Sequence, residues 1–255
     1  MELDSAPISM DLPPQTKMRC RIADLLVEVP EAGGMAPRCT DYLTSEYGEP
    51  DIVIDENRYR TNEYPDFVSE EIVAYMESGS QFSSNLLKFE GMYLHSSAVE
   101  LNGDAYLFSG PCGRGKSTHA RLWQQTFGSA AQVFNDDKPA LRRHNGVWYA
   151  YGTPWCGKDG INQNKKVPIA GICFLKQAQE NKMRRLSPSE AMQKIMAQTM
   201  WRFKSVNYLD KVLDLVDKLV REIPVYELEN RPEPEAARLS YETMNRGAKE
   251  NKNEN

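Results

Sequence analysis

The sequence predicts an α/β protein, in which a mixed sheet flanked by helices is preceded by a small N-terminal α+β subdomain. Two observations lead to this fold class. A short apolar strand, a glycine-rich loop and a helix follow one another between residues 105 and 128. Apolar segments of strand length then alternate with helical segments up to about residue 244, as expected for a sheet covered by helices.

The chain divides into three segments by composition. Residues 1–89 hold no recognisable motif and are expected to form the N-terminal auxiliary subdomain. Residues 90–244 contain the strand, loop and helix described above and are expected to form the main domain. Residues 245–255, NRGAKENKNEN, are strongly polar, and we expect a disordered tail there.

In the N-terminal segment, RIADLLVEV at 21–29 is typical of a strand, and a second strand is expected shortly after Pro50. Two helices should follow, because Ser69 and Ser83 each stand where an N-cap would begin a helical pattern.

The main segment begins with a hairpin, since Asn102-Gly103 between two apolar runs is the strongest short hairpin signal. A capping serine, Ser187 or Ser189, and a long apolar stripe with helical spacing predict two later helices. In chain order, strands are expected at 105–108, 132–137, 147–152, 168–175 and 224–230, and helices at 116–127, from 187, at 207–223 and at 231–244.

Composition and charge narrow the function classes. Of 255 residues, 40% are hydrophobic and 26% are charged, which is sufficient for a globular core. The net charge of −5 and the lack of a Lys/Arg stripe argue against nucleic acid as the main partner. No apolar run has membrane-spanning length and the N-terminus is acidic, so no membrane partner and a cytoplasmic location are expected. Five cysteines without a C-x-x-C pair fit reduced, structural thiols.

Residues 109–118, SGPCGRGKST, match the phosphate-binding P-loop pattern G-x-x-x-x-G-K-[ST] at every fixed position. Glycines let the backbone N–H groups converge on a phosphate, Lys116 can reach the β- and γ-phosphates, and Ser117 can ligate Mg²⁺. A mobile surface turn is the alternative, but the flanking strand and helix favour a nucleotide site. The predicted nucleotide-binding residues are Gly110, Pro111, Cys112, Gly113, Arg114, Gly115, Lys116, Ser117 and Thr118.

Asp136 and Asp137 close the apolar strand that follows the P-loop helix, where P-loop enzymes often place a metal-binding carboxylate. A simple turn before Lys138-Pro139 is the alternative. His95 precedes the hairpin, which could return it beside the P-loop strand, where a histidine can orient a carboxylate. A satisfied structural histidine is the other interpretation.

Taken together, the order histidine, hairpin, P-loop, helix, strand and Asp-Asp resembles the catalytic domain of bacterial HPr kinase/phosphorylase. That family shares its core with ATP-dependent phosphoenolpyruvate carboxykinases, and the likeness runs from about Tyr93 to Met244. It implies that Lys116 binds phosphate and that Ser117 binds Mg²⁺. It also implies that Asp136, helped by His95, handles the proton of a substrate serine, with Asp137 near the metal.

The sequence departs from that family in two places. The N-terminal ninety or so residues are unlike the longer N-terminal domain of the HPr enzymes, and GTPWCGKDGINQN at 152–164 replaces their glycine-rich segment. These departures resemble shorter HPr-kinase-related proteins, some of which act on peptides or on free serine. Trp155 and Lys158 either contact nucleotide or substrate or belong to an ordinary anchored loop. Arg184 and Arg185 either supply charge to phosphoryl transfer or form a solvated basic pair.

The function expected from these residues is an Mg²⁺- and ATP-dependent kinase that phosphorylates a hydroxyl, most simply serine in a peptide, a small protein or a free amino acid. Two other functions stay open: a carboxykinase-like lyase, and a non-catalytic protein that binds nucleotide and a peptide partner. Pyrophosphate as donor and a homo-oligomeric state are also left open by the sequence.

Overall fold

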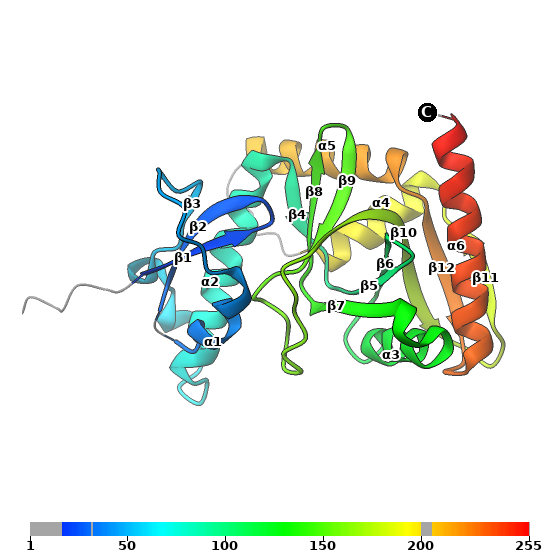
Figure 1. The fold of residues 1–255 in the computed structure, drawn as a ribbon, viewed down its shortest axis with the longest axis horizontal. Helices are drawn as coiled ribbons and strands as arrows, with labels where there is room; N and C mark the ends of the chain where they lie inside the picture. The colour runs from blue at the N-terminus through cyan, green and yellow to red at the C-terminus, as the bar shows by residue number, and fades with distance from the viewer. Residues whose placement is uncertain (1–16, 32, 200–205, 255) are drawn as a thin grey trace, which may run out of the picture.

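A computed structural model describes residues 17–31, 33–199 and 206–254 (Figure 1). The fold is a mixed α/β arrangement, with a small sheet near the N-terminus and a large mixed sheet flanked by helices. Within these described residues no helix combines the length and the apolar character needed to cross a membrane.

The small sheet has three strands in the order β1–β2–β3: β1 (Lys17–Ile22), β2 (Leu25–Pro30) and β3 (Ile52–Val53). The single strand predicted at 21–29 is wrong, because the chain reverses there in a tight hairpin. Ala23 and Asp24 have φ of 53° and 60°, the left-handed pair that a two-residue hairpin turn requires. Because the apolar pattern continues through these residues, the turn could not be recognised from the sequence. The strand expected after Pro50 is confirmed but short.

The N-terminal part also contains two helices: α1 (Ala36–Cys39), between β2 and β3 in the chain, and α2 (Glu70–Leu86), after β3. Ser69 caps α2 as predicted, since its side chain accepts a hydrogen bond from the Ile72 amide. The second predicted helix start at Ser83 is wrong, because α2 runs through it. Gly79 does not interrupt α2, and it lets the helix approach Trp155, whose ring a Cβ at this position would meet at 2.9 Å.

The nine strands of the large sheet include both short edge strands and one long central strand, β10. In chain order they are β4 (Gly91–Tyr93), β5 (Ser96–Leu101), β6 (Asp104–Ser109), β7 (Ala131–Asp137), β8 (Ala140–His144), β9 (Val147–Tyr151), β10 (Lys166–Gln177), β11 (Lys182–Arg185) and β12 (Val225–Asn230).

Seven of these strands follow the order β4–β8–β9–β10–β6–β5–β7, and β12 pairs with both β10 and β11. The start of β10 is antiparallel to β9, whereas its later residues are parallel to β6 and to β12. The predicted hairpin at Asn102-Gly103 is confirmed as the turn between β5 and β6. Because β6 is flanked by β10 and β5, the loop after it leaves from the middle of the sheet.

Helices cover both faces of this sheet: α3 (Lys116–Phe127), α4 (Pro188–Gln198), α5 (Val206–Glu222) and α6 (Pro234–Glu254). Side chains along β6 point alternately to the two faces of the sheet, and this explains why a layer of helices packs on each face. Leu107 faces a core that includes residues of α4 and α5, whereas Tyr106 and Phe108 face a core shared with α3 and α6. The ends of α3 and α4 match expectation, with Gly128 as the C-cap of α3 and Ser187 in a capping box at α4.

The predicted disordered tail is wrong for residues 245–254, which continue α6. The polar composition suggested disorder, but one face of this helix is covered by the sheet. Ala248 is buried in the same core as Met244, and Gly247 lies so close to Tyr226 that no Cβ would fit there. Tertiary contacts therefore stabilise a segment that sequence composition alone describes as a loose tail.

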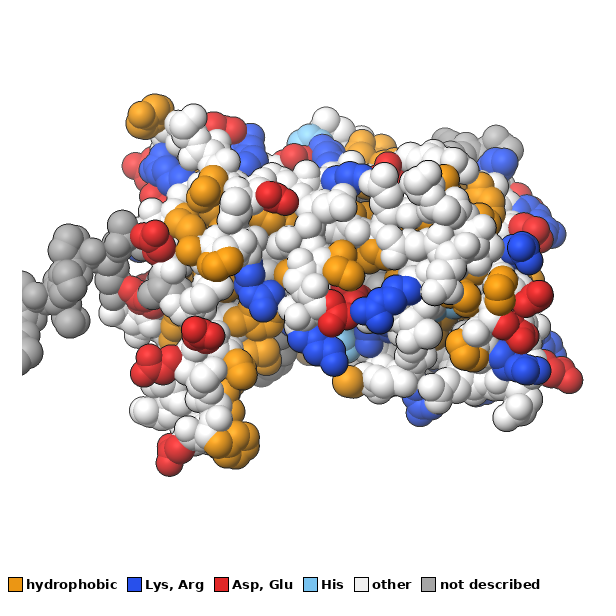
Figure 2. All heavy atoms as spheres, turned by 60° about the horizontal axis from the view of Figure 1, so that its bottom comes forward, with side chains coloured by type: hydrophobic (Ala, Val, Ile, Leu, Met, Phe, Trp, Pro, Cys, Tyr) orange, Lys and Arg blue, Asp and Glu red, His pale blue; other side chains and the backbone are white. Residues whose placement is uncertain are grey.

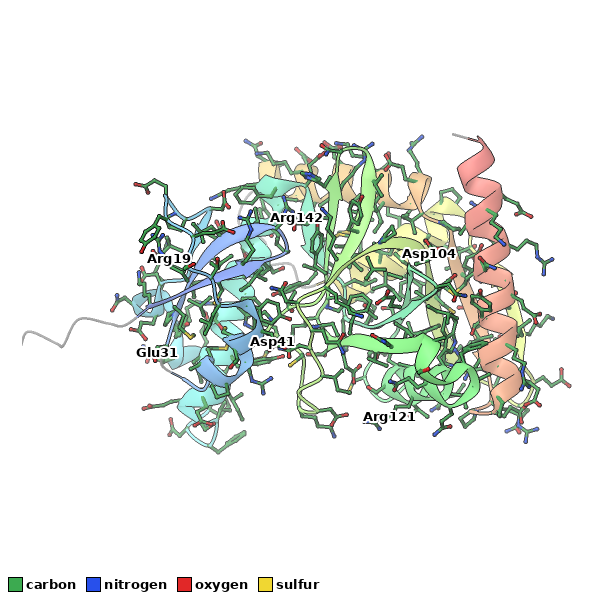
Figure 3. The ribbon with its side chains drawn as sticks, viewed as in Figure 1. Arg19, Glu31, Asp41, Asp104, Arg121 and Arg142 are labelled. Carbon is green, nitrogen blue, oxygen red and sulfur yellow. The ribbon has the colours of Figure 1, made fainter. Side chains whose placement is uncertain are left out.

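A third core cluster crosses the boundary predicted at residue 89. It includes Val27 and Phe82 from the N-terminal part and Tyr93 and Trp155 from the large sheet and its loop. Figure 3 shows Arg142 of β8 reaching toward the N-terminal hairpin, where its guanidinium donates to the Ala23 carbonyl. The division into two domains stays a prediction, but the two parts share buried surface.

Replacing Trp155 with alanine is expected to lower the free energy of unfolding by about 3–5 kcal/mol, the usual cost of truncating a large buried aromatic. Trp155 is fully buried, stacks on Phe82 with ring centroids 4.8 Å apart, and donates from Nε1 to Ser78 Oγ at 3.0 Å. Urea unfolding measures the loss, with Trp155→Phe as a control that keeps a stacked ring. A loss below about 1 kcal/mol for Trp155→Ala would contradict this anchoring role.

Candidate functional site

The residues of the P-loop form a cradle between β6 and α3. Gly110, Gly113 and Gly115 have φ of 146°, 78° and 90°, a region that favours glycine over other residues. A Cβ added at Gly113 or at Gly115 would meet no atom within 4 Å, so both glycines border open space. The backbone is thus both bent and uncovered, as an anion-binding loop requires.

Helix α3 directs its N-terminus at this open space. Its first hydrogen bond runs from the His119 amide to the Gly115 carbonyl at 2.8 Å, so the amides of residues 116–118 have no partner within the helix. Lys116 Nζ donates to the Gly110 carbonyl at 3.0 Å, and burial lowers the pKa of this lysine. Unpaired helix amides and a neighbouring cation make this end of α3 favourable for negative charge.

A cavity of about 460 Å³ collects most of the predicted site residues. Gly110, Pro111 and Arg114 belong to the loop but do not line this cavity. Its lining includes Cys112, Gly113, Gly115, Lys116, Ser117, Thr118, His95, Asp136 and Asp137, together with Cys156, Gly157, Lys158 and Asp159.

Strand pairing brings the histidine and the aspartates to this cavity. Antiparallel β5 and β7 are in register so that Ser96 lies opposite Asp137 and Ser97 opposite Asp136. His95 precedes β5, and its carbonyl accepts a hydrogen bond from Ser109 Oγ at the end of β6, 2.8 Å away. The hairpin therefore returns His95 to the P-loop strand, as predicted from Asn102-Gly103.

In the structure His95 contacts Asp137, and not Asp136, the partner that the family resemblance implies. His95 Nε2 lies 3.2 Å from Asp137 Oδ1, and Lys138 Nζ contacts the other carboxylate oxygen. Burial alone would raise the pKa of Asp137, but the hydrogen bond from His95 and the charge of Lys138 outweigh it and lower the pKa to about 2. Asp137 also has φ of 113°, which a non-glycine residue rarely adopts and which re-aims its side chain at the end of the strand.

Asp136 has different surroundings, although it lines the same cavity. It is buried and accepts a hydrogen bond from Ser97 Oγ on the neighbouring strand. Neighbouring positions on a strand face opposite sides, so the two carboxylates of the Asp-Asp pair have different partners. The sequence marked both residues but could not distinguish their partners.

Two residues at the site were missed by sequence reasoning. Tyr75 of α2 accepts a hydrogen bond from the Gly157 amide at 2.9 Å and lies within 3.5 Å of Asp137 Oδ2 through its hydroxyl. Lys138 is largely buried, and its Nζ also lies 3.3 Å from the Tyr75 hydroxyl. Lys138 directly follows the Asp pair in the sequence, and this adjacency could have identified it as a residue of the site. No sequence pattern points to Tyr75, because it lies in the N-terminal segment, far along the chain from the motifs of the site.

The loop at 152–164 closes one side of the cavity. Arg121 of α3, labelled in Figure 3, bonds Asp159 with Nη2 and Oδ2 2.6 Å apart. Arg38 of α1 donates to the Gly157 carbonyl at 3.0 Å. Lys158 is exposed and lines the cavity. Trp155 is buried against α2, so it is the anchor of the loop and does not face a ligand.

Arg184 and Arg185 do not line the cavity. Both belong to β11, and Arg184 pairs with Glu190 at 2.9 Å and with Glu227 at 3.0 Å. The structure therefore supports the interpretation of a solvated basic pair at the edge of the sheet.

The residues of the cavity fit Mg²⁺ as a phosphate-bound ion. Ser117, Asp136 and Asp137 bring a hydroxyl and carboxylate oxygens to the cavity, and Mg²⁺ prefers such ligands. In the described part of the chain no group of three or more His, Cys, Asp or Glu side chains could hold a metal ion. Phosphate oxygens would therefore complete the set of ligands.

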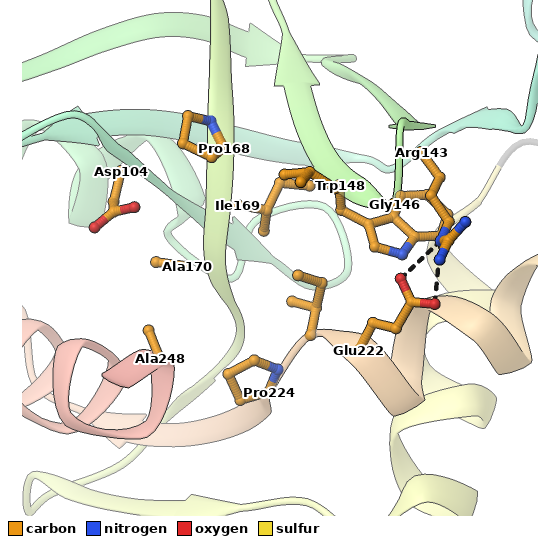
Figure 4. Close-up of a pocket in the computed structure, with 12 residues that line it drawn as sticks. Asp104, Arg143, Gly146, Trp148, Pro168, Ile169, Ala170, Glu222, Pro224 and Ala248 are labelled. Carbon is orange, nitrogen blue, oxygen red and sulfur yellow. Dashed lines mark hydrogen bonds and ion pairs between the residues drawn. The ribbon is translucent and has the colours of Figure 1, made fainter. Parts of the chain in front are cut away.

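A second cavity of about 450 Å³ contains none of the predicted site residues. It lies between β9, β10, the end of α5 and α6, and the Arg143–Glu222 ion pair borders it, with Nε and Oε2 2.8 Å apart (Figure 4). The face drawn in Figure 2 carries basic and acidic side chains intermixed, without a continuous basic stripe.

We expect His119 to make the helix behind the P-loop sensitive to acid. Burial lowers its pKa from 6.5 to about 3, and its ring packs against Phe108 with centroids 4.6 Å apart. The folded protein keeps His119 neutral. The stability that depends on this neutral form is therefore complete above pH 6.5 and is lost as the pH falls toward 3. By pH 4 this residue alone should reduce the free energy of unfolding by about 3 kcal/mol.

Urea unfolding at pH 7.5 and pH 4 tests this expectation on the wild type and on His119→Gln. The variant should be less stable at pH 7.5 but should lose less stability on acidification. Equal losses in both proteins would assign the acid sensitivity to other groups.

Comparison with known proteins identifies one family. The family model described as "SynChlorMet cassette protein ScmC" matches residues 67–231, which is more than half of the chain and includes α2 with Tyr75. No curated protein matches. Among solved structures, the HPr(Ser) kinase/phosphatase from Coxiella burnetii aligns over 62% of this chain and 90% of that chain, with 12% identity and a TM-score of 0.35. This is a remote likeness.

Proposed function

We propose that this chain, which belongs to the family of SynChlorMet cassette protein ScmC, is an Mg²⁺- and ATP-dependent kinase that transfers the γ-phosphoryl group to a hydroxyl. One observation carries the proposal: the glycine cradle of the P-loop and the His95–Asp137 pair border the same cavity. A phosphate site beside an oriented carboxylate is the minimum arrangement for phosphoryl transfer. The proposal includes an HPr-kinase-like order of the core elements, from His95 through the P-loop to the Asp pair.

In this proposal the loop amides and Lys116 bind the β- and γ-phosphates. Mg²⁺ would be held by Ser117 and Asp136, and when bound it neutralises charge on the phosphates. Asp136 is assigned to the metal because its hydrogen bond to Ser97 fixes one oxygen and leaves the other available.

Asp137 is the carboxylate proposed to orient the acceptor hydroxyl and to take its proton. This reverses the roles implied by the sequence resemblance, because His95 contacts Asp137. With a pKa of about 2, Asp137 is ionised at neutral pH and can accept a hydrogen bond. A weak base suffices, since phosphoryl transfer depends mainly on positioning and charge stabilisation. His95, Lys138 and Tyr75 would hold the carboxylate in place.

The proposal is tested with γ-labelled ATP and Mg²⁺, with transfer of label to serine acceptors measured beside ATP binding by calorimetry. Transfer that requires Mg²⁺ and an acceptor supports a kinase. Tight ATP binding without any turnover would instead favour the non-catalytic nucleotide-binding alternative. Substituting pyrophosphate for ATP in the same assay identifies the donor.

A further inference from the structure

We infer that the phosphoryl acceptor enters through a separate small cavity beside His95 and Asp137, and that this cavity takes a neutral, hydroxyl-bearing group. The inference rests on the proposed function and deepens it. The cavity has a volume of about 250 Å³. Its walls come from Met76 of α2, from residues 197–199 at the end of α4, and from Tyr93, His95, Asp137 and Lys138.

This cavity and the P-loop cavity share His95 and Asp137 as lining residues, and no residue of the P-loop lines the smaller one. The carboxylate therefore has phosphate-binding residues on one side and a second opening on the other. A hydroxyl that approaches Asp137 from the smaller cavity meets the carboxylate before it meets the phosphate. The two substrates can then bind from different sides, as an in-line displacement requires.

Backbone contacts tie the wall of the smaller cavity to the reactive pair. The His95 amide donates to the carbonyl of Gln198 at 2.9 Å, so the end of α4 is fixed directly to the histidine. Thr199 is buried and bonds back to the Ile195 carbonyl at 2.6 Å, which holds that end in place. The described end of α4 is thus held against His95 by hydrogen bonds.

The chemical step balances with these groups alone. Asp137 accepts the proton as the acceptor oxygen forms a bond to the γ-phosphorus. The bond from that phosphorus to the β–γ bridging oxygen breaks, and ADP leaves with the electron pair. Lys138 already pairs with Asp137 and with Tyr75, so the cavity presents no unpaired lysine that would require an acidic acceptor.

The lining of the smaller cavity favours one kind of acceptor group. A cavity of about 250 Å³ can hold an amino-acid side chain with its adjoining backbone. Met76 and Ala197 supply apolar surface on facing elements, which favours a neutral group over a charged one. The shared chemistry is an aliphatic hydroxyl, as in free L-serine or in a serine residue of a peptide.

Ala197→Trp tests the location of the acceptor site. Ala197 is exposed at the end of α4, so the larger ring should fold without disturbing the core while narrowing the cavity. Gln193→Trp is the matched control, since Gln193 is exposed one turn earlier and does not line the cavity. The probes are L-serine and acetyl-Ala-Ser-Ala-amide, which distinguish a free amino acid from a peptide residue.

We expect Ala197→Trp to raise the KM for the accepted probe at least about tenfold and to leave the Kd for Mg-ATP within about twofold, whereas Gln193→Trp changes neither. A second variant, Met76→Ala, alters another wall of the cavity and should change the KM for the accepted probe while the Kd for Mg-ATP stays within about twofold. Equal KM values for the two tryptophan variants would overturn the inference. A wild type that binds Mg-ATP but transfers to neither probe would also overturn it, whereas absence of Mg-ATP binding would overturn the proposed function itself.

Discussion

Replacing Lys116 with alanine is expected to weaken Mg-ATP binding at least about a hundredfold and to abolish phosphoryl transfer. The lysine is half-buried beside the glycine cradle, and its Nζ contacts the carbonyls of Gly110 and Pro111. Removing one partner of a desolvated charge pair costs about 2–5 kcal/mol, and 1.4 kcal/mol corresponds to a factor of ten. No other lysine belongs to the loop.

Calorimetric titration with Mg-ATP measures this effect. Lys182→Ala is the control, because Lys182 is exposed on β11 and does not line the cavity. The melting temperature of both variants should stay close to that of the wild type, which separates lost binding from lost folding. Unchanged ATP affinity in Lys116→Ala would remove the P-loop from the nucleotide site.

Asp137→Asn is expected to reduce the rate of transfer by about two to four orders of magnitude while ATP affinity stays within a few-fold. The amide keeps the shape of the side chain but loses the negative charge that His95 and Lys138 face. It therefore can neither take the proton nor hold the hydroxyl in the same way. Because the pKa of Asp137 is about 2, the wild-type rate should show no titration of this group between pH 5 and pH 8.

Asp136→Asn is the matched control for the neighbouring carboxylate. It should raise the Mg²⁺ concentration needed for half-maximal transfer and should recover much of the rate at high Mg²⁺. If Asp136→Asn instead shows the larger, Mg²⁺-independent loss, the acceptor-orienting role belongs to Asp136. Rates near wild type for both variants would make the Asp pair a structural turn.

Local sequence determined the features whose physical causes lie within a few residues. Glycines at 110, 113 and 115 are needed where φ is positive, so the P-loop and the helix after it could be recognised directly. The same holds for the Asn102-Gly103 turn and for the capping box at Ser187. Where local signals were ambiguous, as at Ala23-Asp24, the prediction was wrong.

Only the tertiary structure decided which residues meet at the site. The sequence named His95 and both aspartates, but the register of β5 against β7 and the unusual φ of Asp137 determine that His95 contacts Asp137. Tyr75 reaches this carboxylate across a sequence separation of 62 residues, because α2 packs against the loop through Trp155. Backbone propensities and turn rules act over one or two turns of chain. Contacts between distant segments depend instead on how buried surfaces fit together, which no short pattern encodes.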